Sequence, residues 1–96
     1  MEKIEWSELA LSDLQSIHEY ISQDSAFYAD KLIDRIAGRI DQLENFPQSG
    51  RVVPELNNEM IRELIEGRYR IVYQIKGGQI GIARIHHSAM ILKNLK

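Results

Sequence analysis

The sequence predicts an α+β fold in the order β-α-α-β-β-β, with a helical hairpin packed on one face of a small antiparallel sheet. Apolar residues recur at three- and four-residue spacing in the first half of the chain and alternate at two-residue spacing in the second half. Helices followed by a run of strands are typical of the α+β class. Because the chain has 96 residues, we expect a single domain over residues 1–96.

The first half of the chain is predicted to form a short strand and two helices. We expect the strand over residues 3–6 and Ser7 as the N-cap of a helix whose apolar stripe continues to Ile21. A second, longer helix follows a turn at residues 22–25. It ends before Pro47, since proline disfavours helical geometry in the residue that precedes it.

The second half is predicted to form consecutive strands. Residues 61–65 and 69–76 are rich in apolar residues, and residues 79–87 return as a further strand. The Gly77-Gly78 pair between the last two tolerates the positive φ that a tight hairpin turn requires. We expect residues 51–53 to form a brief strand or an extended arm, and the sheet face away from the helices to be open.

Composition excludes several classes of protein. The chain has no cysteine, so neither a disulfide framework nor a thiolate metal site is expected. The adjacent His86 and His87, with His18 far away on a helix, do not form a metal signature, so we expect no metal and no cofactor. The N-terminus is charged from residue 2, and no apolar run approaches the ~20 residues that span a bilayer. A cytoplasmic location without a membrane partner is therefore expected.

Charge is distributed unevenly along the chain. The formal net charge is −2, whereas proteins that bind many phosphates are usually basic. Residues 1–50 hold four basic and ten acidic residues, and residues 51–96 hold eight basic and four acidic ones. The second half can therefore present a local basic patch, which suits a small anionic site better than a long polyanion.

Basic side chains recur on the predicted strands and at their ends. They are Arg62, Arg68, Arg70, Arg84, His86 and His87. Adjacent residues of a strand point to opposite faces, so only one of the two histidines can join a site on the open face. Two interpretations of Arg70 stay open: a sheet residue paired with a carboxylate, or a cation that holds a phosphate or a partner's carboxylate.

Several short motifs together resemble one family. In the first predicted helix these motifs are Trp6-Ser7, Ala10, Asp13-Leu14, Ile17 and Tyr20-Ile21. At the end of the second helix and after it they are Leu43, Phe46-Pro47, Gly50-Arg51 and Pro54-Glu55-Leu56. On the predicted strands they are Ile61 to Leu64, Tyr69 to Tyr73 and Ile85 to Ser88. Their order and spacing resemble the RelE/ParE superfamily, the toxin half of type II toxin–antitoxin pairs. This resemblance implies the fold inferred above and a cognate antitoxin that wraps the toxin and neutralises it.

The superfamily resemblance implies two function classes, and the fold does not choose between them. RelE-like members are ribosome-dependent ribonucleases that cut mRNA without a metal. Such a reaction needs a base, a cation at the phosphate and an acid. The resemblance places Arg70 at the arginine of those enzymes. It places His86 or His87 near the histidine of their YoeB-like branch, and Glu55 near the loop glutamate that pairs with that histidine. The chain departs from that pattern at Glu63, beside Arg62, where RelE has a lysine pair, and in lacking a C-terminal tyrosine.

The ParE-like branch, whose members inhibit DNA gyrase, is the favoured interpretation. The two long helices and the segment from Phe46 to Arg51 resemble that branch, and a near-neutral charge suits a protein target. Met90 stands where family members often carry an arginine, so a degenerate module that binds antitoxin without toxicity is a third possibility. We expect an enzyme, a metal-independent endoribonuclease, only if the RelE-like interpretation holds.

A set of residues is expected to contact the antitoxin. Arginines would hold acidic antitoxin side chains, and leucines near the C-terminus would offer an apolar edge. They are Arg51, Arg62, Arg70, Arg84, Leu92 and Leu95.

Overall fold

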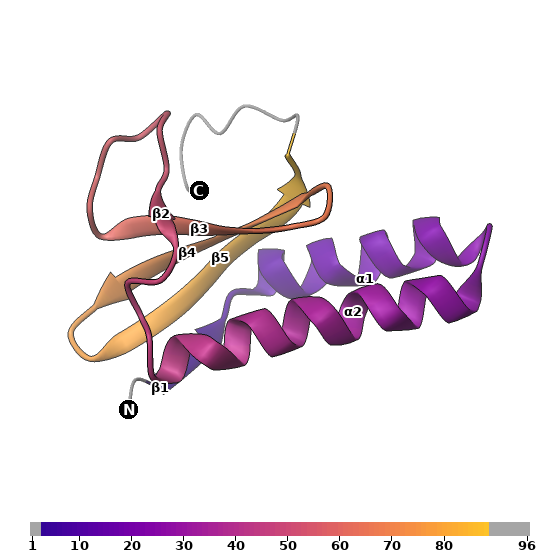
Figure 1. The fold of residues 1–96 in the computed structure, drawn as a ribbon, viewed down its shortest axis with the longest axis horizontal. Coiled ribbons are helices and arrows are strands. Elements are labelled where there is room, and N and C mark those ends of the chain that lie inside the picture. Colours follow the sequence, from indigo (N-terminus) through magenta and orange to yellow (C-terminus); the bar gives the residue numbers. More distant parts are fainter. Residues whose placement is uncertain (1–2, 89–96) are drawn as a thin grey trace.

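The computed structural model describes residues 3–88 of the chain. The elements are β1 (Lys3–Trp6), α1 (Glu8–Ser22), α2 (Ala26–Asp41), a short 3-10 helix η1 (Gln42–Glu44), β2 (Arg51–Val52), β3 (Ile61–Glu66), β4 (Tyr69–Lys76) and β5 (Gln79–His87). The two helices form a hairpin against one face of the sheet and protrude past it (Figure 1). The predicted α+β fold is confirmed. Within the described residues, no helix is long and apolar enough to span a bilayer.

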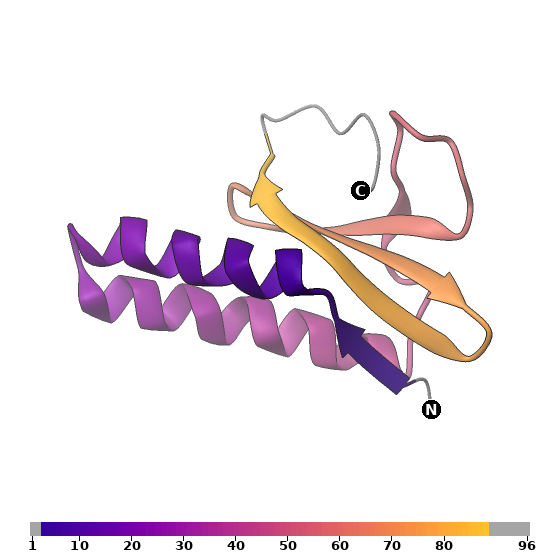
Figure 2. The same cartoon turned by 180° about the vertical axis from the view of Figure 1, so that it is seen from behind.

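The sheet is mixed, whereas the sequence predicted an antiparallel one. Its strand order is β1-β5-β4-β3-β2, and neighbours are antiparallel from β2 to β5. β1 runs parallel to β5, with Lys3 opposite Gln79 and Trp6 opposite Ile82. Figure 2 shows that β1 lies beside β5 and that α1 continues from the end of β1. β1 pairs with the first half of β5, and α1, which follows β1, contacts the second half through Asp13.

Serine hydroxyls begin both helices. Ser7 Oγ accepts a hydrogen bond from the Ala10 amide at 2.9 Å, as predicted. Ser25 Oγ accepts one from the Tyr28 amide at 3.1 Å. Such caps are each worth about 1 kcal/mol. Ser7 Oγ also donates to the carbonyl of Ala83 at 2.8 Å, so the same hydroxyl ties the start of α1 to β5.

Asp13 of α1 supplies a hydrogen-bond acceptor to the second half of β5, where a neighbouring strand would otherwise supply it. Beyond Ile82, no strand among residues 3–88 pairs with the outer edge of β5. Asp13 Oδ2 accepts hydrogen bonds from the amide of Ile85 at 2.9 Å and from Nε of Arg84 at 2.8 Å. The carboxylate therefore satisfies a backbone group at this edge of the sheet.

We expect Asp13→Ala to lower the free energy of unfolding by about 1–3 kcal/mol, because it removes charge-assisted bonds and leaves the Ile85 amide without its acceptor. Urea unfolding followed by circular dichroism measures the change. Asp30→Ala is the matched control, because the Asp30 side chain is 72% exposed. Equal losses in the two variants would contradict the edge role of Asp13.

Two apolar clusters hold the layers together. The main one lies between the sheet and the helices and contains Ala10, Leu32, Ile36, Ile40, Leu43, Leu64, Ile71, Tyr73, Ile80, Ile82 and Ile85. The smaller one joins Val53 and Val72, with Leu56 and Ile61 packed against it. Because Val72 points away from the helices, the loop from residue 53 to residue 60 covers part of the face that was expected to be open.

Candidate functional site

Two arginines and two glutamates form a chain of ion pairs on the sheet face opposite the helices. Nη1 and Nη2 of Arg70 donate to the two carboxylate oxygens of Glu55 at 2.7 and 2.9 Å. Nε of Arg70 donates to Oε1 of Glu63 at 2.6 Å. Oε2 of Glu63 accepts from Nε of Arg51 at 2.5 Å. Arg70 is 4% exposed and Glu63 is 1% exposed, so the centre of the network is buried.

Strand register brings these side chains to one face. Along β4, Ile71 points into the main core, so Arg70 and Val72 point the other way. Glu63 lies opposite Val72, and Arg51 lies opposite Glu63. Arg51, Glu63 and Arg70 therefore lie on three adjacent strands. Glu55 joins them from the loop that Val53 and Leu56 hold against Val72.

The network is electrically balanced, with two guanidinium groups and two carboxylates. The hydrogen bonds from Arg70 to Glu55 are the largest cause that raises the pKa of Arg70 above its ordinary value. This guanidinium therefore stays protonated. A bidentate arginine–carboxylate pair is among the strongest side-chain interactions. An incoming phosphate can reach Nη1 and Nη2 of Arg70 only if Glu55 moves away.

The structure separates the two histidines. His86 is the cross-strand partner of Arg70 on the open face and is 8% exposed. Its Nδ1 lies 3.3 Å from the carbonyl oxygen of His87. His87 is exposed, and its ring meets that of Tyr69 edge-on, with 5.8 Å between centroids. Glu55, Arg70 and His86 therefore share one face, and His87 does not join them.

The remaining arginines do not form one patch with Arg70. Arg62 donates from Nη1 to the Gly50 carbonyl at 3.0 Å and from Nε to the Glu59 carbonyl at 3.1 Å. Arg84 bonds Asp13, and this bond raises the pKa of the Arg84 guanidinium. The expected row of arginines is thus divided among the network, a loop and α1. Leu92 and Leu95 lie outside the described residues.

The structure has a groove beside Tyr69 that the sequence did not predict. One hollow of about 430 Å³ is lined by Asp13, Ser16, Ile17, Tyr20, Tyr69, Arg84, Ile85, His86 and His87. A second, of about 410 Å³, is lined by Ile21, Tyr28, Leu32, Gly67, Arg68 and Tyr69. Tyr69 therefore lines both hollows. We call them together the Tyr69 groove. One feature of the sequence could have predicted this groove: the aromatic residues Tyr20 and Tyr28 lie outside the apolar stripes of the helices.

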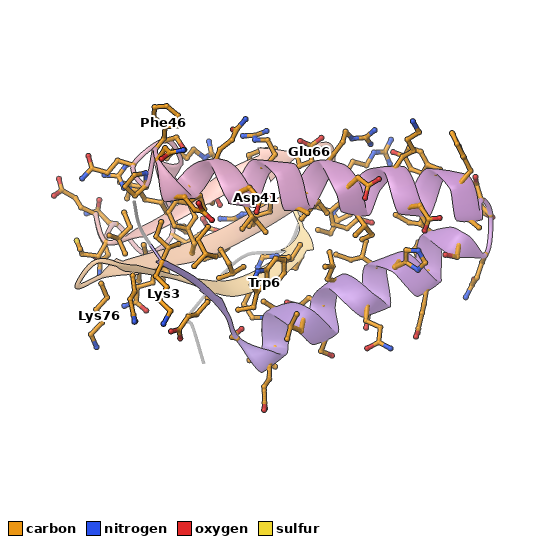
Figure 3. The ribbon with its side chains drawn as sticks, turned by 90° about the horizontal axis from the view of Figure 1, so that it is seen from below. Lys3, Trp6, Asp41, Phe46, Glu66 and Lys76 are labelled. Carbon is orange, nitrogen blue, oxygen red and sulfur yellow. The ribbon has the colours of Figure 1, made fainter. Side chains whose placement is uncertain are left out.

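Glu66 of β3 joins the sheet to α2 beside this groove. Its carboxylate pairs with Arg35 at 3.3 Å and with Arg39 at 3.4 Å, and the side chain lies next to α2 (Figure 3).

Among residues 3–88, no three histidine, aspartate or glutamate side chains are grouped to hold a metal ion.

Comparisons with known proteins define the class. The structure matches one described as "Chromosomal ParDE TA system from P. aeruginosa" with a TM-score of 0.75, over 91% of this chain and 96% of that chain. At 24% identity this match shows a shared fold. "Toxin RelE2" from Caulobacter vibrioides is 31% identical over 91 residues, which are 95% of this chain and 100% of the relative. The fold and this relative define a toxin of the RelE/ParE superfamily, as predicted.

The family is narrower than that superfamily. Residues 4–92 match the family described as the ParE toxin of the type II toxin–antitoxin system parDE. The chain belongs to this ParE toxin family.

Proposed function

We propose that this chain is a ParE-like toxin that inhibits DNA gyrase and is neutralised by a cognate antitoxin. The observation that carries the proposal is the ion-pair network around Arg70. A ribonuclease of the RelE-like kind needs a cation directed at the scissile phosphate, where negative charge develops. Here Nε, Nη1 and Nη2 of Arg70 all donate to carboxylates.

Glu63 adds a second argument against a phosphate at this position. Its side chain is 0% exposed and lies on the same face as Arg70. Its carboxylate already accepts from Nε of Arg70 and from Nε of Arg51, so neither of these donors is directed at an approaching phosphate. The net charge of −2 also suits a protein target better than a phosphate-rich one.

A RelE-like ribonuclease is the second candidate, and one observation favours it. Glu55 and Arg70 are bonded, and His86 lies opposite Arg70 on the same face. These residue types can supply a base, a cation and an acid for RNA cleavage without a metal. This candidate requires Glu55 to release Arg70 when RNA binds.

Two assays on the purified toxin distinguish the candidates: DNA supercoiling by gyrase, and cleavage of ribosome-bound mRNA. We expect supercoiling to be blocked and mRNA to remain intact. In cells that lack the antitoxin, DNA synthesis should stop before protein synthesis in pulse labelling. Cleaved mRNA with normal supercoiling would reject the proposal and favour the ribonuclease. If neither assay responds while the antitoxin still binds, the chain is a degenerate binding module.

A further inference from the structure

We propose that a line of cations and an exposed aromatic ring on α2 bind a short single strand of DNA. The phosphates lie along the cations, and an unpaired base lies against the ring. The residues are Phe27, Lys31, Arg35 and Arg39, which we call the α2 stripe. This contact with nucleic acid is an addition to the proposed function. It rests on that function in one respect, the choice of DNA over RNA, because gyrase acts on DNA.

Helical spacing places the three cations in one line. Positions 31, 35 and 39 are four residues apart, and residues at this spacing are neighbours on the surface of a helix. At 1.5 Å per residue, the line is about 12 Å long. Three exposed aspartates follow a second line, about a third of a turn away around the helix axis: Asp30, Asp34 and Asp41. α2 therefore separates its positive side chains from its negative ones, and the first line is complementary to phosphates.

Glu66 of β3 positions the two guanidinium groups of the line. Its carboxylate lies 3.3 Å from Nε of Arg35 and 3.4 Å from Nη1 of Arg39. The side chains of Arg35 and Arg39 are still 47% and 37% exposed, so a ligand can reach both guanidinium groups. Such groups suit phosphate because they offer several N–H donors in a fixed, planar geometry. Since one carboxylate faces three cations, the stripe keeps an excess of positive charge.

An exposed aromatic ring lies beside this charge. Phe27 is 73% exposed, and Nζ of Lys31 lies 5.2 Å from the centroid of its ring. Proteins that bind single-stranded nucleic acid combine a positive surface that follows the backbone with aromatic rings on which bases stack. An acidic protein segment would be attracted by the same cations, but it has no base to stack on the ring. The pairing of Phe27 with Lys31 therefore favours a nucleotide, whose base and phosphate can contact the two side chains together.

The place of the stripe in the fold makes it accessible. α2 begins at Ala26, so Phe27 lies near the tip of the helical hairpin, which protrudes past the sheet (Figure 1). Apolar side chains on DNA-binding proteins can insert between bases, and a protruding tip can carry such a side chain into an opened duplex. The net charge of −2 disfavours a long contact with DNA. The line of about 12 Å covers only about three phosphates of one strand, so the contact is short.

Fluorescence anisotropy of a labelled oligothymidylate of about 10 nucleotides, titrated with the full chain, tests the inference. We expect a Kd of about 10–100 μM at low salt, and a slope of about −2 when the logarithm of the binding constant is plotted against that of the salt concentration. Phe27→Ala should raise Kd by about fivefold or more, because it removes the stacking contact. Lys31→Glu should raise Kd about tenfold and reduce the size of the slope by about 0.7 or more.

Two matched controls change similar side chains at the other end of the molecule. Phe46→Ala removes an aromatic ring that is 64% exposed, and Lys76→Glu reverses an exposed charge. Figure 3 shows both residues at the end opposite the tip of the hairpin. Both controls should bind within about twofold of the wild type, because salt screens charges that are far from the strand. All four variants change exposed side chains, and thermal unfolding should show that they fold like the wild type.

The inference is wrong if the wild type does not bind oligothymidylate, or if Phe27→Ala and Lys31→Glu bind it as tightly as the wild type. Equal weakening by the two controls would also reject it. Equally tight binding of a duplex of the same length would contradict the base contact, and equal competition by polyglutamate would point to an acidic protein instead. Tighter binding of oligouridylate would reject DNA as the ligand.

The anisotropy assay contains no gyrase, so its failure can be told apart from failure of the proposed function. Blocked supercoiling without binding of the oligonucleotide would reject the α2 stripe alone. Binding that depends on the stripe, with normal supercoiling, would reject gyrase inhibition alone.

Discussion

Glu63→Ala is expected to lower the free energy of unfolding by about 3–5 kcal/mol, because it removes one partner from a buried ion-pair network. The Glu63 carboxylate is 0% exposed and bonds both Arg70 and Arg51. Without it, Arg70 keeps Glu55, but its Nε loses its acceptor in a buried position. Equilibrium unfolding in urea, with the slope compared between variants, measures the loss.

Two further variants separate charge from local packing. Glu63→Gln keeps the shape and an acceptor oxygen, so it should lose less stability than Glu63→Ala. Glu59→Ala is the control on the loop before β3, and it should change stability by less than about 0.5 kcal/mol, since Glu59 is exposed and its contact to Arg62 is made by the backbone carbonyl. A Glu63→Ala protein as stable as Glu59→Ala would show that the network contributes little to the fold.

Gly50→Ala is expected to destabilise the protein by about 2–3 kcal/mol through overpacking. A Cβ at this position would lie 2.6 Å from the carbonyl oxygen of Glu63 and 2.6 Å from the hydroxyl of Tyr73. That hydroxyl accepts from the Gly50 amide at 2.9 Å and donates to the Pro47 carbonyl at 2.8 Å. Burial raises the pKa of Tyr73, so the hydroxyl keeps its proton and its bond to Pro47.

Gly38→Ala is the matched control, and it should change the stability of the protein in the opposite direction. A Cβ at Gly38 in α2 would meet nothing within 4 Å, so alanine should raise stability by about 0.5–1 kcal/mol through helix propensity alone. Thermal unfolding of both variants measures the two shifts. A destabilised Gly38→Ala protein would show that α2 is packed more closely at this point than the structure indicates.

These predictions depend on features that the sequence revealed to different degrees. The alternation from Tyr69 to Lys76 identified β4, and the same alternation separated Ile71 from Arg70. Adjacent positions in a strand also predicted that only one histidine joins the open face, and the structure assigns His86 to it. Local rules of this kind involve neighbours in the chain, so one sequence is enough to apply them.

The partners of Arg70 required the tertiary structure. Glu63 is seven positions away and Glu55 fifteen, and their meeting depends on the β3–β4 register and on the loop that Val53 anchors. A shift of one residue in that register would have turned Glu63 to the other face. Sequence reasoning therefore named Glu55 and Arg70 as candidates without showing that they bond each other.

What the sequence by itself determined is the order of the elements and the helix cap at Ser7, because periodicity and capping act over a few neighbouring residues. Only the tertiary structure decided the parallel pairing of β1, the closed network at Arg70 and the Tyr69 groove. Each of these joins segments distant in the chain, and their meeting depends on how the hairpin and the sheet pack together.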